Sequence, residues 1–541
     1  MLKHNAMIKN TTLFLWLTVF LCWVCPGQAQ PVSAPTPSYP PSPQAIALGQ
    51  FAEIPQGSYT GQVPISIPLP SLQTANGFEL PLALEYAGGG LRVDDYPGTL
   101  GMSWTLNAGG MVSRYIQGGD DFGPRGYHNN PVQVPPGAVT DACDWKGGTY
   151  WSDLIQLANQ GKSPYNPDAR PDQYHLNFCG RAARFYYRPD KMPAFVPFQN
   201  LQVLVNYQHI GNPQLQQVSW TISDESGNTY YFSHMELNQL SFSPSGVQDP
   251  YISGAWLSQI KTASGEYIDF EYEPYAYGYD QSRSYDWTIN SECGFEGKHS
   301  VQTTHIEVNT WKLKRISYKS KEILFSYTDF NPVSVLSGIE YRIADQFQRS
   351  YRLEYTTGKD ERIWLERLVQ VDEKGSLPAD ELPTWNFTYL NREELPERLS
   401  TRQDYWGYFN SNPSEESMAP NIVPGIFLTD CNLPGASMDQ RGPVSRDCDP
   451  DRCRFGSLFR IQHPTGGFTE YEWEAHEFTH PDYKYMNILS AVRGAGLRIK
   501  AIRKLDRDEL VLMHQRYAYQ DGLIMTIPIP YSLQYLSCGG I

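Results

Sequence analysis

Apolar and polar side chains alternate along two stretches near the N-terminus. Every second residue is apolar from Val63 to Leu69 and again from Phe78 to Tyr86. A period of two over such lengths predicts β-strands with one buried face. The three prolines at 64, 68 and 70 cannot donate to a ladder, so the first strand is predicted at a sheet edge. Asn76-Gly77 predicts a turn before the second strand, and Trp104 further on offers a large apolar anchor.

The second half of the chain repeats a unit that predicts a β-hairpin. Leu257-x-x-Ile260 is followed by a glycine turn and then by an alternating apolar face that ends at Tyr272. The stretch from Leu458 to Trp473 matches this unit position for position. Because one hairpin cannot bury such a face alone, consecutive copies are predicted to pair into a larger sheet. Looser copies begin at Leu313, Leu365 and Arg498.

The sequence divides into four parts. Lys3 and Lys9 precede a short apolar run, and Gly27-Gln28-Ala29 supplies a cleavage site, so residues 1–29 are predicted to be a signal peptide. Residues 30–50 are rich in Pro and Ser and are expected to form a solvated linker. An N-terminal β module is predicted at 51–250 and a hairpin-repeat β region at 251–541. One short helix is predicted near 152–160, where apolar residues recur at helical spacing.

The amino-acid composition limits which partners and which cellular compartment are expected. The 36 tyrosines favour pleated sheets, in which rings pack across strands. A net charge of −15 disfavours nucleic acid and anionic membrane surfaces as partners. No later stretch could span a bilayer as a helix. Export makes disulfides plausible, and the expected local one joins two of Cys431, Cys448 and Cys453, which share one Pro/Gly/Asp-rich loop.

Seven blocks of sequence resemble the N-terminal region of secreted bacterial Rhs/YD-repeat proteins. The blocks are residues 61–65 (GQVPI), 91–95 (LRVDD), 100–110 (LGMSWTLNAGG), 118–121 (GGDD), 404–408 (DYWGY), 463–467 (HPTGG) and 494–500 (GAGLRIK). The resemblance implies a hollow β-shell built from YD hairpins, often enclosing a C-terminal toxin or effector. The 541 residues show no long YD array, no Rhs core segment and no C-terminal effector. We therefore expect the N-terminal portion of that architecture, as a fragment, a truncated paralogue or one piece of a split system.

The most specific enzymatic motif is His476-Glu477-x-x-His480, which fits the H-E-x-x-H pattern of zinc hydrolases. In that chemistry two histidines one helical turn apart bind zinc, and the glutamate activates water. The motif therefore requires a helix. Here it follows an alternating strand pattern, and Pro481 comes directly after the second histidine. A strand that runs into a loop is the favoured interpretation, with zinc at His476, Glu477 and His480 as the alternative.

A second candidate metal site consists of Asp447, Asp449 and Asp451, whose alternating carboxylates could begin a calcium loop. Arg452 stands where an EF-hand loop needs glycine, so an EF-hand is excluded. A solvated loop whose acids pair with nearby arginines is favoured over a non-standard calcium site. We accordingly expect no cofactor, with calcium and zinc as the alternatives.

Other constellations are weaker. Asp94-Asp95 and Asp120-Asp121 are paired acids, but adjacent residues on a strand point to opposite faces, so turn and cap roles are favoured over a glycosidase dyad. Exposed tryptophans such as Trp364 and Trp406 could stack on sugar rings, although core packing explains most aromatic residues.

These observations favour an exported, mainly β structural module that acts in encapsulation, capping or partner docking without catalysis of its own. Its expected partners are proteins: a downstream Rhs/YD shell or effector, or other secreted or surface proteins. Its expected location is extracellular or on the cell surface, with the periplasm as the alternative. The alternative functions are a surface glycan-binding β module and a zinc hydrolase.

Overall fold

The protein is built almost entirely from antiparallel β-strands. The computed structural model describes residues 38–39, 41–43, 61–123, 126–129, 171–210, 212–243, 246–288, 298–373, 384–412, 446–478, 492–520 and 522. Within these ranges the strands form one 21-stranded sheet and one three-stranded sheet. The mainly β, antiparallel fold class predicted from the alternating patterns is thus confirmed.

The described residues include two short 3-10 helices, η1 (Arg392–Glu394) and η2 (Arg452–Arg454). The strands are β1 (Ser38–Tyr39), β2 (Ile65–Gln73), β3 (Glu79–Tyr86), β4 (Trp104–Asn107), β5 (Gly110–Gln117), β6 (Gln173–Phe178), β7 (Arg181–Tyr187), β8 (Pro193–Val196), β9 (Leu201–Ile210), β10 (Asn212–Asp224), β11 (Thr229–Ser243), β12 (Gly246–Val247), β13 (Tyr251–Lys261), β14 (Tyr267–Thr288), β15 (Lys298–Tyr318), β16 (Lys321–Asp329), β17 (Ser334–Ile343), β18 (Gln346–Thr357), β19 (Ile363–Val371), β20 (Thr384–Tyr389), β21 (Leu458–Gln462), β22 (Phe468–Phe478), β23 (Val492–Leu505) and β24 (Val511–Arg516).

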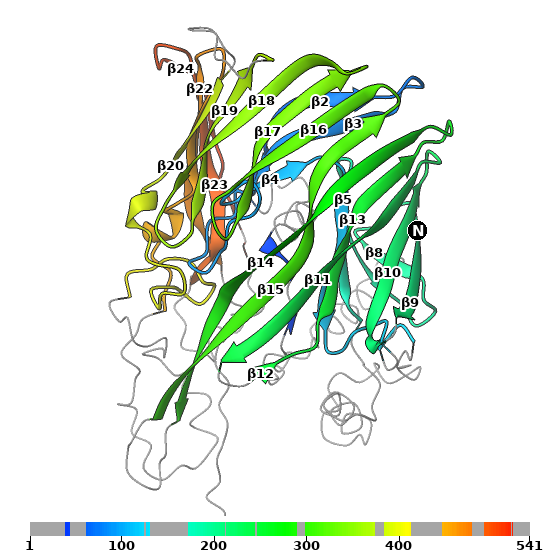
Figure 1. The fold of residues 1–541 in the computed structure, drawn as a ribbon. Helices are drawn as coiled ribbons and strands as arrows, with labels where there is room; N and C mark the ends of the chain where they lie inside the picture. Colours follow the sequence, from blue (N-terminus) through cyan, green and yellow to red (C-terminus); the bar gives the residue numbers. More distant parts are fainter. Residues whose placement is uncertain are drawn as a thin grey trace, which may run out of the picture.

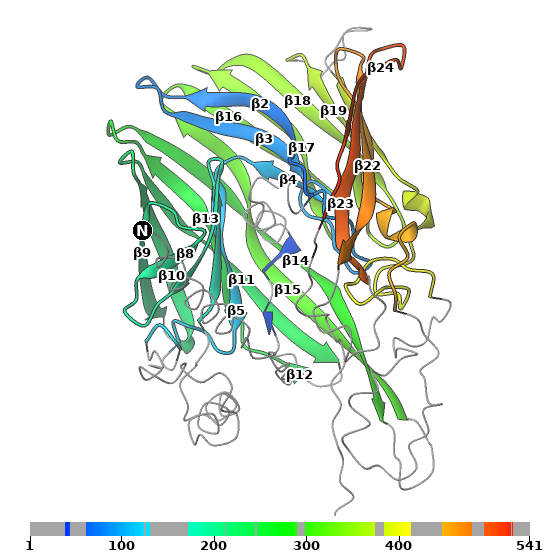
Figure 2. The same ribbon diagram turned by 180° about the vertical axis from the view of Figure 1, so that it is seen from behind.

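The large sheet forms a curved wall (Figures 1 and 2). From β15 to β24, each strand pairs antiparallel with the next strand along the chain. At the other end, β13 pairs with β5, β11 and β14. Because β5 and β11 precede residue 250 and β13 follows it, the sheet is continuous across that position.

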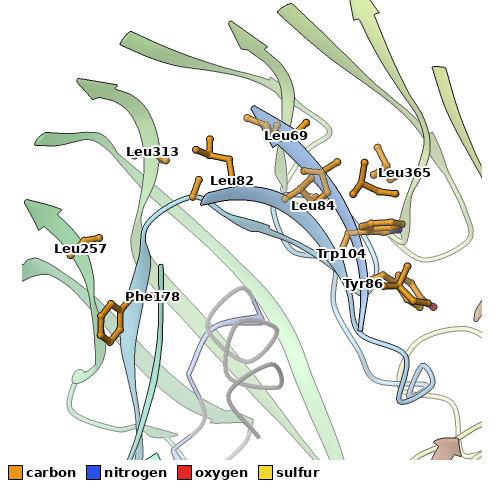
Figure 3. Close-up of a cluster of buried hydrophobic side chains, with 14 of the residues drawn as sticks. Leu69, Leu82, Leu84, Tyr86, Trp104, Phe178, Leu257, Leu313 and Leu365 are labelled. Carbon is orange, nitrogen blue, oxygen red and sulfur yellow. The ribbon is translucent and has the colours of Figure 1, made fainter. Parts of the chain in front are cut away.

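The three-stranded sheet, β2-β3-β4, lies inside the curve of the wall (Figure 2). Its strand β2 is an edge strand, as the prolines predict, because β2 pairs only with β3 in this sheet. The buried leucines of β2 and β3 point toward Leu313 and Leu365 of the wall (Figure 3). Trp104 on β4 is only 1% exposed, and its indole N–H donates to the Tyr389 hydroxyl at 2.8 Å. Apolar packing and this hydrogen bond therefore join the inner sheet to the wall.

A specific hydrogen bond recurs in the hairpins of the wall. The hydroxyl or indole N–H of an aromatic residue donates to the main-chain carbonyl of the leucine that opens the unit, at 2.7–3.0 Å. Each aromatic residue follows directly on a shift in strand register. Such a bulge redirects the side chain, which lets the ring reach back to that carbonyl. The pairs are Tyr272–Leu257, Tyr327–Leu313, Tyr355–Leu336, Tyr389–Leu365 and Trp473–Leu458.

The hairpin repeat predicted from the sequence is confirmed. The four units that begin at Leu257, Leu313, Leu365 and Leu458 are the hairpins β13–β14, β15–β16, β19–β20 and β21–β22. The fifth predicted unit is β23–β24, where Tyr519 donates to the carbonyl of Ile499. The unit at Leu336 was not predicted, although Leu336-x-x-Ile339 has the same opening pattern.

Other predictions fall partly or wholly outside the described residues. The signal peptide at 1–29, the helix near 152–160 and His480 lie outside them. Of the predicted linker at 30–50, residues 38–39 and 41–43 are described, and Ser42 is buried rather than solvated. Among the residues that the structure describes, none belongs to a helix with the length and apolar character needed to cross a bilayer.

Candidate functional site

Three of the sequence blocks that carry the family resemblance meet at one place, which we call the motif junction (residues 88–95, 404–408 and 494–498). Arg92 and Tyr408 form a β-bridge, and the Val93 amide donates to the Gly407 carbonyl at 2.8 Å. The Arg92 guanidinium also lies over the Tyr408 ring, 5.9 Å from its centroid. Segments more than 300 residues apart in sequence are thereby held side by side.

Asp404 organises the second of these blocks. Its carboxylate is fully buried and accepts hydrogen bonds from the amides of Trp406 (2.8 Å) and Tyr408 (3.0 Å). This is the geometry by which an aspartate closes a tight turn on its own backbone. Burial raises the pKa of Asp404 to about 6, against the opposing effect of the amide hydrogen bonds. The guanidinium of Arg446 donates to the Asp404 carbonyl at 2.6 Å and fastens the turn to the chain before η2.

The third block approaches the other two through glycines. The Leu497 amide donates to the Gly89 carbonyl at 3.0 Å. Gly496 has a φ of 92°, and a Cβ there would lie 2.6 Å from the Tyr408 hydroxyl oxygen and 2.7 Å from the Gly89 carbonyl oxygen. A Cβ on Gly494 would overlap the Trp406 ring. The close approach of these segments therefore requires glycine at both positions.

Two arginines enclose the Asp94-Asp95 pair. Arg362, which is 2% exposed, donates to the carbonyls of Val93 (2.9 Å) and Pro396 (2.7 Å). Arg398 donates to the Asp94 carbonyl at 3.4 Å and lies over the Tyr96 ring at 4.6 Å. Burial, together with the charge of Asp95, raises the pKa of Asp94 to about 6. Arg362 and Arg398, next to the junction, thus bond mainly to main-chain groups, and these bonds position the chain segments.

The other acidic pair belongs to a separate buried network. Arg114 on β5 is fully buried, and it donates to Asp172 and to Asp120. The Asp121 carboxylate accepts from the Asp172 amide at 3.0 Å. The network joins the 118–121 block to the start of β6, the strand that pairs with β5. Arg114 and Asp172 were not singled out from the sequence, because nothing local distinguishes their charges from solvated ones.

The structure places His476 and Glu477 on β22, which extends to Phe478. Neighbouring residues of a strand point to opposite faces, so the side chains of His476 and Glu477 diverge. Glu477 is exposed and pairs with Arg493 at 3.3 Å. Burial, reinforced by the charge of Arg498, lowers the pKa of His476 to about 4. The strand interpretation of this stretch agrees with the structure as far as Phe478.

Asp447, Asp449 and Asp451 lie in the loop that leads into η2. Asp449 accepts from the amides of Asp451 (3.0 Å) and Arg452 (3.1 Å), and Asp451 pairs with Arg454 at 2.7 Å. Asp449 and Asp451 are therefore used in a turn and in ion pairs with arginines. No group of three or more potential metal ligands among His, Cys, Asp and Glu occurs within the described ranges.

Cys448 lies within the same loop, and Cys453 lies in η2. Both are free thiols, and they are hydrogen-bonded to each other. This hydrogen bond, together with burial, raises the pKa of Cys448. Cys431, the third member of the predicted disulfide group, lies outside the described residues.

The suggestion that Trp364 is an exposed sugar platform is wrong. Trp364 is 2% exposed on β19, where it packs on Tyr389 with ring centroids 4.8 Å apart. Ile363 and Leu365 on either side of it are also buried, so both faces of this strand are covered. Trp406 is half-buried against Gly494. Packing within the protein accounts for both rings.

The wall ends in an edge strand with exposed apolar side chains. Among the described residues, β24 pairs with β23 alone. Leu510, just before β24, is 64% exposed, and Val511, Leu512 and Met513 within it are 56%, 71% and 38% exposed. Because neighbouring strand residues alternate between faces, apolar groups are exposed on both faces of β24. Contiguous exposed apolar surface on an open strand edge is typical of a site that another chain segment covers.

No protein-family model matches the chain, and no curated protein matches it. Similar solved structures include the crystal structure of TcdB2-TccC3, with 10% identity over 67% of this chain and a TM-score of 0.31. They also include the Photorhabdus luminescens Tc holotoxin pore, with 9% identity over 90% of this chain and a TM-score of 0.32. The chain spans only 18% and 22% of the lengths of those two solved chains. The resemblance to Rhs/YD-repeat proteins therefore rests on the sequence blocks, and these low scores add no argument about function.

Proposed function

We propose that this chain is an exported structural module that forms part of the wall of a larger Rhs/YD-like β-shell. It has no catalysis of its own. The proposal is supported by the repeated hairpins, by the inner sheet fastened to the wall, and by the meeting of the family blocks at the motif junction. Charged groups of the junction serve to hold distant chain segments together, which is the role expected of a scaffold.

The single observation that carries the proposal is the edge strand β24. A wall built by adding one hairpin after another can be lengthened at such an edge by one more antiparallel strand. The four exposed apolar residues from Leu510 to Met513 supply the surface that a following hairpin would cover. The proposed partner is therefore a β-hairpin array of the same architecture, encoded downstream in the same or an adjacent reading frame.

The proposal is tested by producing the chain together with that downstream hairpin array. The array is expected to co-purify with the chain and to slow hydrogen exchange at the amides of β24. Leu512→Lys is expected to abolish co-purification, because a charge would be buried at the contact. Val247→Lys is the matched control, since Val247 is 69% exposed on β12, away from this edge. Equal co-purification of both variants, or the absence of any adjoining hairpin array, would overturn the proposal.

A further inference from the structure

A short segment near the N-terminus lies against the wall rather than in solvent. β1 pairs antiparallel with β5, with Ser38 opposite Gln117 and Tyr39 opposite Ile116. Three residues further on, Ser42 is fully buried. We call residues 38–39 and 41–43 the N-terminal strap.

Ser42 occupies a socket whose floor is the carboxylate of Glu236 on β11. Glu236 is fully buried. Its Oε1 accepts from the Ser42 amide (3.1 Å) and from the Ser253 hydroxyl (2.7 Å). Its Oε2 accepts from the Ser42 hydroxyl (2.8 Å) and from the Thr310 hydroxyl (2.8 Å). Ser42 alone thus supplies one donor to each oxygen of the carboxylate.

The other donors of this socket come from strands of the wall. The Trp256 indole N–H donates to the Thr310 hydroxyl oxygen at 3.1 Å, which leaves the Thr310 hydrogen directed to Glu236. Ser253 and Thr310 come from β13 and β15, two of the strands that pair with β11. No ion pair joins Glu236 to a basic residue within the described parts of the chain. The buried carboxylate therefore depends on neutral donors, and half of them belong to Ser42.

The composition of the strap suits burial. Ser42 lies between Pro41 and Pro43, and proline has no N–H that would need a partner. The Ser42 amide is consequently the only main-chain donor among residues 41–43, and Glu236 satisfies it. A segment with several free amides at this point would leave donors unpaired in the interior, at a cost for each one.

We propose that the Glu236 socket is a peptide-binding site for a segment with a single serine between prolines, and that its occupant is this chain's own strap. Strand pairing with β5 sets the direction of the segment, and Glu236 selects the serine through its amide and hydroxyl together. The strap then ties β5, from the early part of the chain, to β11, β13 and β15 across the wall.

A peptide titration tests this site. Ser42→Asp in the intact chain is expected to expel the strap, because a second carboxylate cannot share the socket with Glu236. A fluorescein-labelled peptide of residues 36–45 should then bind that variant, as followed by anisotropy, and should bind the unaltered chain far more weakly because the strap competes at a high effective concentration. The matched peptide with Ser42→Ala should bind at least tenfold more weakly, since it loses a hydrogen bond to a charged group. Equal binding of the two peptides, or no binding of either, would overturn the proposal.

A disulfide trap tests the same seating without displacing the strap. Ser42→Cys combined with Thr310→Cys should form a cross-link on mild oxidation by glutathione disulfide, identified by peptide mass mapping. Ser42→Cys combined with Ser317→Cys is the control, because seven residues along β15 correspond to about 23 Å. Absence of the 42–310 link, or its formation in no greater yield than the 42–317 link, would show that the strap is not seated at Glu236.

Discussion

Replacing Tyr389 by phenylalanine tests how the inner sheet is fixed to the wall. The Tyr389 hydroxyl lies between two buried groups: it donates to the Leu365 carbonyl at 2.7 Å and accepts from the Trp104 indole N–H at 2.8 Å. Tyr389→Phe removes both bonds and leaves the Trp104 N–H without a partner in the core. Tyr327→Phe is the matched control, because Tyr327 makes the same repeat bond, to Leu313 at 3.0 Å, without an indole attached.

The two substitutions should differ in how much they lower the free energy of unfolding, because only Tyr389→Phe leaves the Trp104 indole N–H without a hydrogen-bond partner. Losing the repeat hydrogen bond should cost about 1 kcal/mol in either variant. A buried donor left unpaired adds about 1–3 kcal/mol, so Tyr389→Phe should lower the free energy of unfolding by about 2–4 kcal/mol in all. Urea titration followed by far-ultraviolet circular dichroism measures both values, provided that the slope of the transition is unchanged.

A double-mutant cycle with Trp104→Phe isolates the bond between the two side chains. Once the indole is gone, Tyr389→Phe should cost no more than Tyr327→Phe does, so the coupling energy should be about 1–3 kcal/mol. Equal costs for Tyr389→Phe and Tyr327→Phe in the unaltered background, or a coupling energy near zero, would refute the view that this hydrogen bond fixes the inner sheet to the wall.

Three further predictions concern other positions. The pKa of Asp404 is raised from 3.8 to about 6, so the stabilisation that comes from its protonation is complete below pH 3.8 and is lost as the pH rises through 6. The free energy of unfolding of Asp404→Asn should therefore rise by about 2 kcal/mol relative to that of the unaltered chain between pH 4 and pH 7 in urea titrations, and a constant difference would contradict this assignment. Gly101→Ala should lower the melting temperature more than Gly77→Ala does, because both glycines have positive φ but only at Gly101 would a Cβ meet a backbone atom, the Ile363 carbonyl oxygen at 2.5 Å. Metal analysis of the purified protein should find no stoichiometric zinc, and the zinc content should be the same in Glu477→Gln. One bound zinc per chain would instead support the hydrolase alternative.

Local patterns were sufficient to predict the hairpins. Alternation and glycine turns identified the units at Leu257 and Leu458, because side-chain period and turn chemistry are properties of neighbouring residues. The bulge before each repeat aromatic could not be predicted in this way, since it depends on pairing with the next strand. The same opening pattern at Leu336 was a usable signal that was missed. At Trp364, the run of three apolar residues was the signal for a strand covered on both faces.

Contacts between residues that are distant in the sequence could not be predicted from it. Nothing near Trp104 indicates that its partner is Tyr389, and nothing near Ser42 indicates Glu236, 194 residues away. Such pairs form because the wall curves and brings distant strands together, and that curvature is a property of the whole sheet. The sequence blocks did indicate which segments matter, since three of them meet at the motif junction.

Particle images of the full-length gene product, together with any adjoining hairpin array, test the central claim most directly. A continuous curved β-wall that extends from the β24 edge, with the inner sheet inside its curve, is the result that the account predicts. Compact separate domains without a continuous wall, or a particle in which β24 remains uncovered, would contradict it.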